Sequence, residues 1–506
     1  MKSTEELRKG IFALAAIALL SGCSNSTSSS SGKKQNSQSA GSSSLSSSES
    51  KSAGSSSEGK SGSVSASSQD SSSDDDDGNI VLNVTDEEIL PYKSSPISLS
   101  FWSPIVGPDA GYFQDIIKTW NDKYGSSIYI NSDPVEEEAH YTRILTSLND
   151  NSTADITFIH KQRLARYERT GKLRDMSDIT KNAGLDSSQY IDGAWDDGVG
   201  NDGKLYALTA DYLPTLLFYN KKLIPEGYSE DDILSDDFTY EKMCEMSSKA
   251  YIHNRVAAKR KYGFAFNYGY CEEPFITNLY GLGATPVSAS DPTAPLYDSD
   301  DGFKAVKAIE SIPFTTDSEG RKVSSDSGSD HRTVFKAGRA LFTMDGLWST
   351  TSLVFHNDTV DTGIAFLPKV NSSASRLAYS DAHMFVCFNN KNVSTARDGA
   401  ISLFLKYFTA NTVYWCKSGK VAATKKAAAS PIYKALDWSF VSDRFSSVRT
   451  PEKIYTYQTI TSHAAETISE ICEGKGNDGT TAYSDDEIKA MIKNSAVEAA
   501  NLAKKL

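Results

Sequence analysis

Cys23 is the residue whose neighbours indicate a specific chemistry, the covalent attachment of a lipid to its thiol. Basic residues, among them Arg8 and Lys9, precede an apolar run over residues 11–20 that is too short to span a bilayer. The run ends in Leu20-Ser21-Gly22-Cys23, the pattern of an export signal with a lipobox. We expect residues 1–22 to be removed and Cys23 to carry a diacylglyceryl group. An ordinary signal peptide with a cysteine at its boundary is the alternative.

The other cysteines suggest neither a metal site nor a disulfide framework. Five remain after Cys23, none of them in a CxxC pair and none beside a histidine cluster: Cys244, Cys271, Cys387, Cys416 and Cys472. Because their number is odd, at least one thiol is free. An acidic stretch over residues 298–302 begins like a calcium loop, but Ile309 stands where the loop's last acidic ligand should be. We therefore expect no metal, and we interpret this stretch as the start of a helix.

Catalytic signatures do not stand in a useful context anywhere in the chain. No GxSxG, HExxH, GxxxxGK[ST] or GxGxxG motif is placed between elements that could use it. Acidic pairs that could serve a glycosidase are abundant, but a sequence cannot show the separation that such an enzyme requires. The sequence therefore favours a protein that is not an enzyme and that uses no cofactor.

The segment after Cys23 has the composition of a tether. More than half of residues 24–73 are serine, and large apolar side chains are almost absent. Such a segment cannot bury enough apolar surface to offset its conformational entropy. We expect residues 23–90 to be a disordered, lipid-anchored tether, whose low-complexity part spans on the order of 40 Å as a flexible coil.

The remaining body is large enough for two lobes, since a single core rarely grows to this length. Apolar spacing predicts strands at residues 97–101, 128–130, 155–159 and 213–219. Helices are predicted near residues 113–120, 141–148, 240–251, 302–311 and 484–506. This alternation predicts an α/β fold with a parallel sheet. The net charge of −13 argues against a nucleic-acid partner.

Several segments resemble the family 1 extracellular solute-binding proteins, which include the maltose-binding proteins. The family's crossover motif "GKLYALP … LYYNK" is matched by residues 203–208 and 217–221, and its "F..GKAAM…G.W" segment by residues 335–348. Residues 418–424 are similar to its "GG.IPA" turn, and residues 365–368 to its "PLP" strand. Thr209 stands where the family often has proline, and Val421-Ala422 replaces Ile-Pro. The order of these segments along the chain extends the resemblance over most of the body, residues 97–506.

The resemblance implies a type II periplasmic-binding-protein fold, with two α/β lobes joined by crossover strands and a ligand cleft between them. Lobe 1 would comprise residues 91–210 and 380–430, and lobe 2 residues 211–379 and 431–506. The chain would cross near residues 209–214, 376–385 and 424–433. Closure over a ligand would then be a hinge motion at these crossings.

A sugar site needs flat aromatic rings and planar polar groups, because sugars present both C–H faces and hydroxyls. Trp348 matches the family position whose indole stacks on sugar, and Trp102 ends the first predicted strand. The other candidates are Asp211 and Tyr212 at the first crossing, Asp381 and His383 at the second, and Tyr268 with its neighbour Tyr270 in a loop. His160 and Lys161 close the third strand. Core packing is the alternative for each aromatic residue, and a structural role is the alternative for His383.

These features predict an extracellular, lipid-anchored protein that captures a sugar, most simply an oligosaccharide, for the permease subunits of an ABC importer. We expect a monomer that faces the outside of the cell membrane, as on a Gram-positive surface. The alternatives are a binding protein for a non-sugar polar solute, a surface glycosidase, and a lipoprotein that adheres to polysaccharide.

Overall fold

The computed structural model describes residues 78–506 apart from 326–329, 356–358 and 477–480. The expected signal peptide, Cys23 and most of the expected tether lie outside the described residues. The folded body nevertheless begins before residue 90, because α2 spans Asp86–Lys93 and starts with a capping box between Thr85 and Glu88. Val84 is buried, and its carbonyl accepts a hydrogen bond of 2.7 Å from the Tyr124 hydroxyl. The predicted tether boundary at residue 90 is therefore too late.

The first sheet has five strands in the order β2-β1-β3-β10-β4. They are β1 Ile97–Ser103, β2 Ile128–Pro134, β3 Ile156–His160, β4 Ala207–Thr209 and β10 His383–Val386. β1 pairs in parallel with both β2 and β3, as the βαβ rhythm predicts, and β10 is antiparallel to β3 and β4. This sheet and its helices form lobe 1.

Two helices of lobe 1, α3 Ala110–Tyr124 and α4 Glu137–Leu148, follow the predicted spacing of apolar residues, whereas its other helices were not predicted. In α3, Phe113, Ile116 and Trp120 are buried, and the Trp120 indole donates 2.8 Å to the carbonyl of Ile128 at the start of β2. The others are α5 Leu164–Arg169, α6 Ser177–Asn182, α12 Thr395–Ala410 and α13 Thr412–Cys416.

The second sheet is built around the long strand β5, Asp211–Asn220, and runs in the order β12-β9-β5-β7-β6, with β8 and β11 also paired to β5. Its other strands are β6 Tyr262–Ala265, β7 Ala340–Gly346, β8 Thr362–Ala365, β9 Ala378–Asp381, β11 Val421–Ala422 and β12 Val448–Arg449. This sheet belongs to lobe 2.

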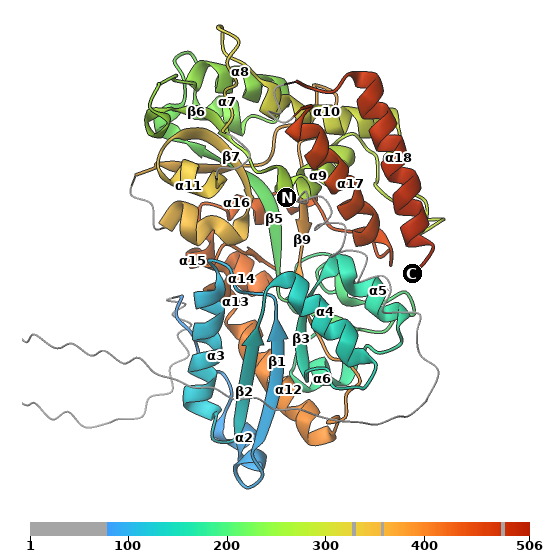
Figure 1. Cartoon of the computed structure of the whole chain (residues 1–506). Coiled ribbons are helices and arrows are strands. Elements are labelled where there is room, and N and C mark those ends of the chain that lie inside the picture. The colour runs from blue at the N-terminus through green and yellow to red at the C-terminus, as the bar shows by residue number, and fades with distance from the viewer. Residues whose placement is uncertain (1–77, 326–329, 356–358, 477–480) are drawn as a thin grey trace, which may run out of the picture. The chain divides into compact units, whose positions relative to one another are not determined.

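Lobe 2 has its own apolar core, in which the predicted C-terminal helix takes part. Its helices are α7 Glu230–Leu234, α8 Tyr240–Ala250, α9 Glu272–Gly281, α10 Asp300–Phe314, α11 His331–Lys336, α17 Tyr457–Glu473 and α18 Asp485–Ala503. The acidic stretch at residues 298–302 does start a helix, since Ser299 caps α10. In Figure 1, α17 and α18 lie side by side at the end of the chain, and Ile460, Ile471 and Ile488 are buried.

The chain passes between the sheets at two alanines. Ala210 separates β4 from β5, and Ala382 separates β9 from β10, two residues after the lobe boundary predicted at residue 380. β5 and β9 run antiparallel with Leu213 opposite Asp381, and Figure 1 shows these two strands of the second sheet side by side near the middle of the molecule. The third predicted crossing is not a strand. It consists of the short helices α14 Lys425–Ala429 and α15 Pro431–Lys434, followed by α16 Phe440–Asp443.

Candidate functional site

The two strand crossings bring the ends of both sheets together. His160, the last residue of β3, lies opposite His383, the first residue of β10. Asp381 lies opposite Leu213 in the neighbouring pair of β5 and β9. The residues predicted at the crossings are therefore close in space, but they differ in their burial and in their hydrogen-bond partners.

Asp211 is fully buried and holds the first crossing in place. Its carboxylate lies 3.0 Å from Nδ1 of His383 and accepts a hydrogen bond of 2.6 Å from the Trp415 indole. Burial raises the pKa of Asp211, but the charge and hydrogen bond of His383 and the contributions of Lys420 and Trp415 outweigh burial and lower that pKa below its usual value. Asp211 has no surface for a ligand in this conformation, contrary to the sequence-based prediction.

His383 is likewise held by contacts with other residues of the protein. Its ring stacks on Phe158 at 5.6 Å and 28° and lies 5.1 Å from the ring of His160. Because Nδ1 of His383 is directed at Asp211, a structural role fits this residue better than the binding of a ligand hydroxyl.

Tyr212 and Asp381 lie on opposite faces of the crossing strands, because Tyr212 is adjacent to Leu213, the partner of Asp381, and neighbours in a strand point to opposite sides. The Tyr212 hydroxyl donates 2.8 Å to Asp197, and its ring packs 4.9 Å from Phe445. It lines a cavity of about 600 Å³ between residues 191–197 and 442–450. The two candidates thus do not share one site.

Asp381 is the predicted residue with unused hydrogen-bonding capacity. Its Oδ1 accepts from the backbone N–H groups of Ala382, at 2.8 Å, and Gln162, at 3.3 Å. Its Oδ2 is buried and has no hydrogen-bond partner among the described residues. Burial raises the pKa of Asp381 to about 7.

Lobe 1 presents an acid–base cluster beside Asp381. The Tyr141 hydroxyl lies 2.6 Å from Nδ1 of His160, and the guanidinium of Arg163 lies 3.7 Å above the Tyr141 ring. The Glu137 carboxylate lies 3.7 Å from Nδ1 of His160 and 3.6 Å from the guanidinium of Arg163, and the Glu137 side chain is 53% exposed. Burial lowers the pKa of His160 to about 3, so this histidine is neutral at physiological pH.

Lobe 2 faces this cluster with two glutamates at the start of α9. Glu272 accepts hydrogen bonds from Thr461, at 2.6 Å, and Ser462, at 3.1 Å, both in α17. Burial raises the pKa of Glu272, and burial together with the charge of Glu272 raises the pKa of Glu273 to about 8. The two lobes meet here, because η1 Lys161–Arg163 of lobe 1 contacts α17 of lobe 2. The charges of Arg163 and Glu137 also act on the pKa of Glu272.

Trp348 is half-buried in a single helical turn, η7 Leu347–Ser349, directly after β7. Its ring lies against the backbone of Gly346, where an added Cβ would come within 2.0 Å of the indole. Gly346 has φ −73°, which any residue adopts. The close approach of the Trp348 ring, and not the local backbone conformation, is therefore what requires a glycine at position 346.

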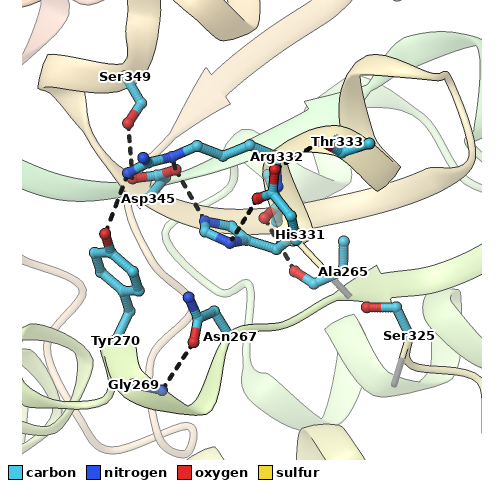
Figure 2. Close-up of polar contacts among 12 residues, drawn as sticks. Ala265, Asn267, Gly269, Tyr270, Ser325, His331, Arg332, Thr333, Asp345 and Ser349 are labelled. Atoms are coloured by element: carbon cyan, nitrogen blue, oxygen red, sulfur yellow. Dashed lines mark hydrogen bonds and ion pairs between the residues drawn. The ribbon is translucent and has the colours of Figure 1, made fainter. Parts of the chain in front are cut away.

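A buried network fixes the turn that carries Trp348 (Figure 2). Asp345 accepts hydrogen bonds from Arg332, at 2.6 and 2.9 Å, and from Ser349, at 2.9 Å, and lies 3.0 Å from Nε2 of His331. The Tyr270 hydroxyl lies 3.4 Å from the Arg332 guanidinium. These contacts tie α11 and η6 Tyr268–Tyr270 to the end of β7.

The other predicted aromatic residues are placed differently. Tyr268 is 9% exposed and packs edge-to-face on Phe266, so it is a core residue, whereas Tyr270 reaches the Arg332 network. Trp102 is half-buried at the end of β1, and the guanidinium of Arg143 lies 4.0 Å above its ring. One face of Trp102 is therefore already occupied. Lys161 forms an ion pair of 2.8 Å with Asp197.

Sequence reasoning missed four charged residues at the junction of the lobes, Glu137, Arg163, Glu272 and Glu273. The adjacent acidic pair Glu272-Glu273, placed before Pro274 at a helix start, was a usable signal. Nothing in the sequence pairs it with α17. Among the described residues, no three His, Cys, Asp or Glu side chains are grouped to hold a metal ion.

The fold and the polar groups that face each other across it define a class, that of two-lobed proteins which bind a solute between their lobes. The chain belongs to the bacterial extracellular solute-binding protein family, which it matches over residues 115–437. It is thus a solute-binding protein and not an enzyme, so the glycosidase alternative fails. In the described part of the chain, no helix is both long and apolar enough to cross a membrane.

Solved structures show the same fold at low sequence identity. The ABC substrate-binding protein Lmo0181 from Listeria monocytogenes, in complex with cycloalternan, is 15% identical with a TM-score of 0.64, and the match covers 81% of this chain and 99% of that one. Maltose-bound MalE3 of T. maritima is 17% identical with a TM-score of 0.63, covering 80% and 99%. UgpB from Mycobacterium tuberculosis, in complex with glycerophosphocholine, is 16% identical with a TM-score of 0.64, covering 81% and 99%. No curated protein sequence matches the chain.

Proposed function

We propose that this protein captures a carbohydrate, most simply an oligosaccharide, between its lobes and delivers it to the permease of its importer. The observation that carries the proposal is the buried Oδ2 of Asp381, which lacks a hydrogen-bond partner among the described residues at the crossing between the lobes. Half-buried Trp348 is the aromatic face that we propose for stacking on the ligand. An aromatic face and planar polar groups are what the C–H faces and hydroxyls of a sugar require. Lmo0181 and MalE3, which share the fold, were solved with cycloalternan and maltose.

Thermal shift against a panel of mono- and oligosaccharides tests this proposal, with calorimetry on each hit and analysis of the recovered sugar. We expect at least one neutral or charged sugar to raise the melting temperature and to be recovered unchanged. A panel in which no sugar binds, while a non-sugar solute does, would contradict carbohydrate capture.

We also propose that the protein is held at the outer face of the cell membrane through lipid on Cys23 and reaches its permease as a monomer. Support comes from the lipobox and from the serine-rich segment that follows it. Cys23→Ala should move the protein from the membrane fraction to the soluble fraction while leaving its melting temperature unchanged. Ser24→Ala, which keeps the cysteine, is the matched control. A Cys23→Ala protein that stays fully with membranes would refute the anchor.

A further inference from the structure

Two buried polar atoms on one face of β9 lack a hydrogen-bond partner among the described residues. They are the hydroxyl of Tyr379 and Oδ2 of Asp381, whose residues are 2% and 7% exposed. Residues two apart in a strand share a face, so both atoms point to the same side of β9. Buried polar groups are normally paired. These atoms therefore mark a place where a ligand completes the hydrogen bonding.

The glutamates of α9 border the same space. α9 packs on β9, since the backbone N–H of Tyr379 donates 3.1 Å to the Thr277 hydroxyl in α9. Burial raises the pKa of the Tyr379 hydroxyl, and the charges of Asp381, Glu272 and Glu273 raise it further. Asp381 likewise contributes to the raised pKa of Glu273. These three carboxyl groups, which come from the packed elements β9 and α9, make up the acidic lining.

The cationic side chains that face this lining are already paired. Lys161 is 2.8 Å from Asp197, and Arg163 is 3.6 Å from Glu137. His160 is neutral, because burial lowers its pKa to about 3, and Nδ1 of His383 is directed at Asp211. Lys161 and Arg163 thus have carboxylate partners of their own, and among the described residues no cationic side chain lies within ion-pair distance of Glu272, Glu273 or Asp381.

We propose that the ligand carries a protonated amine, which lies against Asp381, Glu272 and Glu273 and supplies the missing donors. Because the proposed function is the capture of a sugar, the ligand class is an amino sugar, a hydroxylated ring with a free ammonium group. The ammonium donates to Oδ2 of Asp381, and a ring hydroxyl accepts from the Tyr379 hydroxyl. This inference rests on the proposed function, since it assumes that the interlobe region binds the solute.

The raised pKa values of Asp381, about 7, and Glu273, about 8, fit this arrangement. Burial is the main cause in both groups, and for Glu273 the charge of Glu272 adds to it. Holding buried carboxyl groups close to one another costs free energy while the site is empty. A positively charged ligand relieves the repulsion between their ionised forms, so raised pKa values are expected in a site for such a ligand.

Matched sugar pairs test the inference with the full chain. The probes are glucosamine di- and trisaccharides with free amines and the same sugars with every amine acetylated, titrated calorimetrically at pH 7. We expect the free-amine form to bind at least tenfold more tightly and this preference to shrink with added salt. Asp381→Asn with Glu273→Gln should abolish the preference. Glu241→Gln, a surface substitution in α8, is the control and should leave it intact.

The outcomes separate the inference from the proposed function. Equal or tighter binding of the acetylated sugars overturns the amine inference and leaves sugar capture standing. The amine inference is also overturned if neither series binds while other neutral sugars do, or if calcium ions stabilise the protein as strongly as the free-amine sugars. If no sugar of any kind binds, the proposed function fails, and the inference fails with it. Melting curves show whether each variant is folded, and we expect the double variant to be at least as stable as the parent.

Discussion

Three buried aspartates occupy different environments in this protein. Asp211 and Asp345 are surrounded by side-chain donors, which outweigh the effect of burial and lower the pKa of each. Asp381 receives only backbone donors on one oxygen, and burial raises its pKa to about 7. The first two carboxylates are structural, whereas the third keeps an oxygen for another molecule.

Replacing Asp381 should change how stability depends on pH. A carboxyl group whose folded pKa lies above its unfolded value of about 4 stabilises the fold while protonated, and that contribution is lost as the pH rises from about 4 to about 7. Asp381→Asn removes this loss. Between pH 4 and pH 7 the free energy of unfolding of the variant should therefore rise by up to about 4 kcal/mol relative to that of the parent. Denaturant unfolding at pH 4, 5.5 and 7 measures the difference. A constant difference would show that Asp381 is ionised in the folded protein throughout.

Gly346 offers a test of Trp348 that leaves the indole in the chain. Trp348→Ala should remove on the order of 100 Å² of ligand contact, about 2.5 kcal/mol or nearly a hundredfold in affinity. Gly346→Ala is compatible with the local backbone, but its Cβ must displace the ring, so it should lower affinity in the same direction. Calorimetry with the best sugar of the panel, together with melting curves, checks both variants. Parental affinity in either folded variant would contradict the stacking role.

At the same scale, the sequence identifies single residues better than it identifies pairs. A family resemblance points to Trp348, and a place at a crossing points to Asp381. The hydrogen bond from Thr461 to Glu272 joins residues that are 189 positions apart in the sequence, so no local sequence pattern could reveal it. The opposite facing of Tyr212 and Asp381 likewise depends on the register of β5 with β9.

Among the elements, the ones that apolar spacing predicts are those that bury a regular stripe or a continuous run. β1, β3, β5, α3 and α18 all formed within a few residues of the predicted bounds. α2 was missed because it contains Pro91 and buries few side chains, and it follows a long polar segment. The third crossing was expected to be a strand and is helical, since residues 425–429, Lys-Lys-Ala-Ala-Ala, favour a helix.

Two shortened chains should locate the start of the folded body. A chain that lacks residues 24–73 should keep the melting temperature of the parent, because that segment has too few apolar side chains to contribute to a core. A chain that also lacks residues 74–93 loses the burial of Val84 and Ile89 and the hydrogen bond of Tyr124, at a cost of about 3 kcal/mol. Thermal and denaturant unfolding compare the three chains. Equal destabilisation by both deletions would place part of the core before residue 74.

Across residues 78–506, apart from the three undescribed gaps, the lobes touch through groups on either side of the crossings. The Thr351 hydroxyl donates 3.0 Å to the carbonyl of Pro108, and the Lys453 ammonium donates 2.7 Å to the carbonyl of Val199. The guanidinium of Arg169 lies 4.2 Å above the Tyr455 ring. Such contacts between lobes, with the proximity of η1 Lys161–Arg163 to α17, describe a conformation in which the lobes are closed on each other.

A ligand that contacts both lobes should therefore favour this closed conformation. Binding energy that is available only when the lobes meet shifts the population toward closure, and hinges at Ala210 and Ala382 can absorb the change in backbone angles. For the chain that lacks residues 24–73, small-angle scattering should give a smaller radius of gyration with saturating ligand than without. The liganded profile should match the one calculated from the described residues. The Trp348→Ala variant at the same ligand concentration is the control and should remain expanded. An unchanged radius, with binding confirmed by calorimetry, would show that the protein binds its solute without closing and would remove the reason for placing ligand contacts on both lobes.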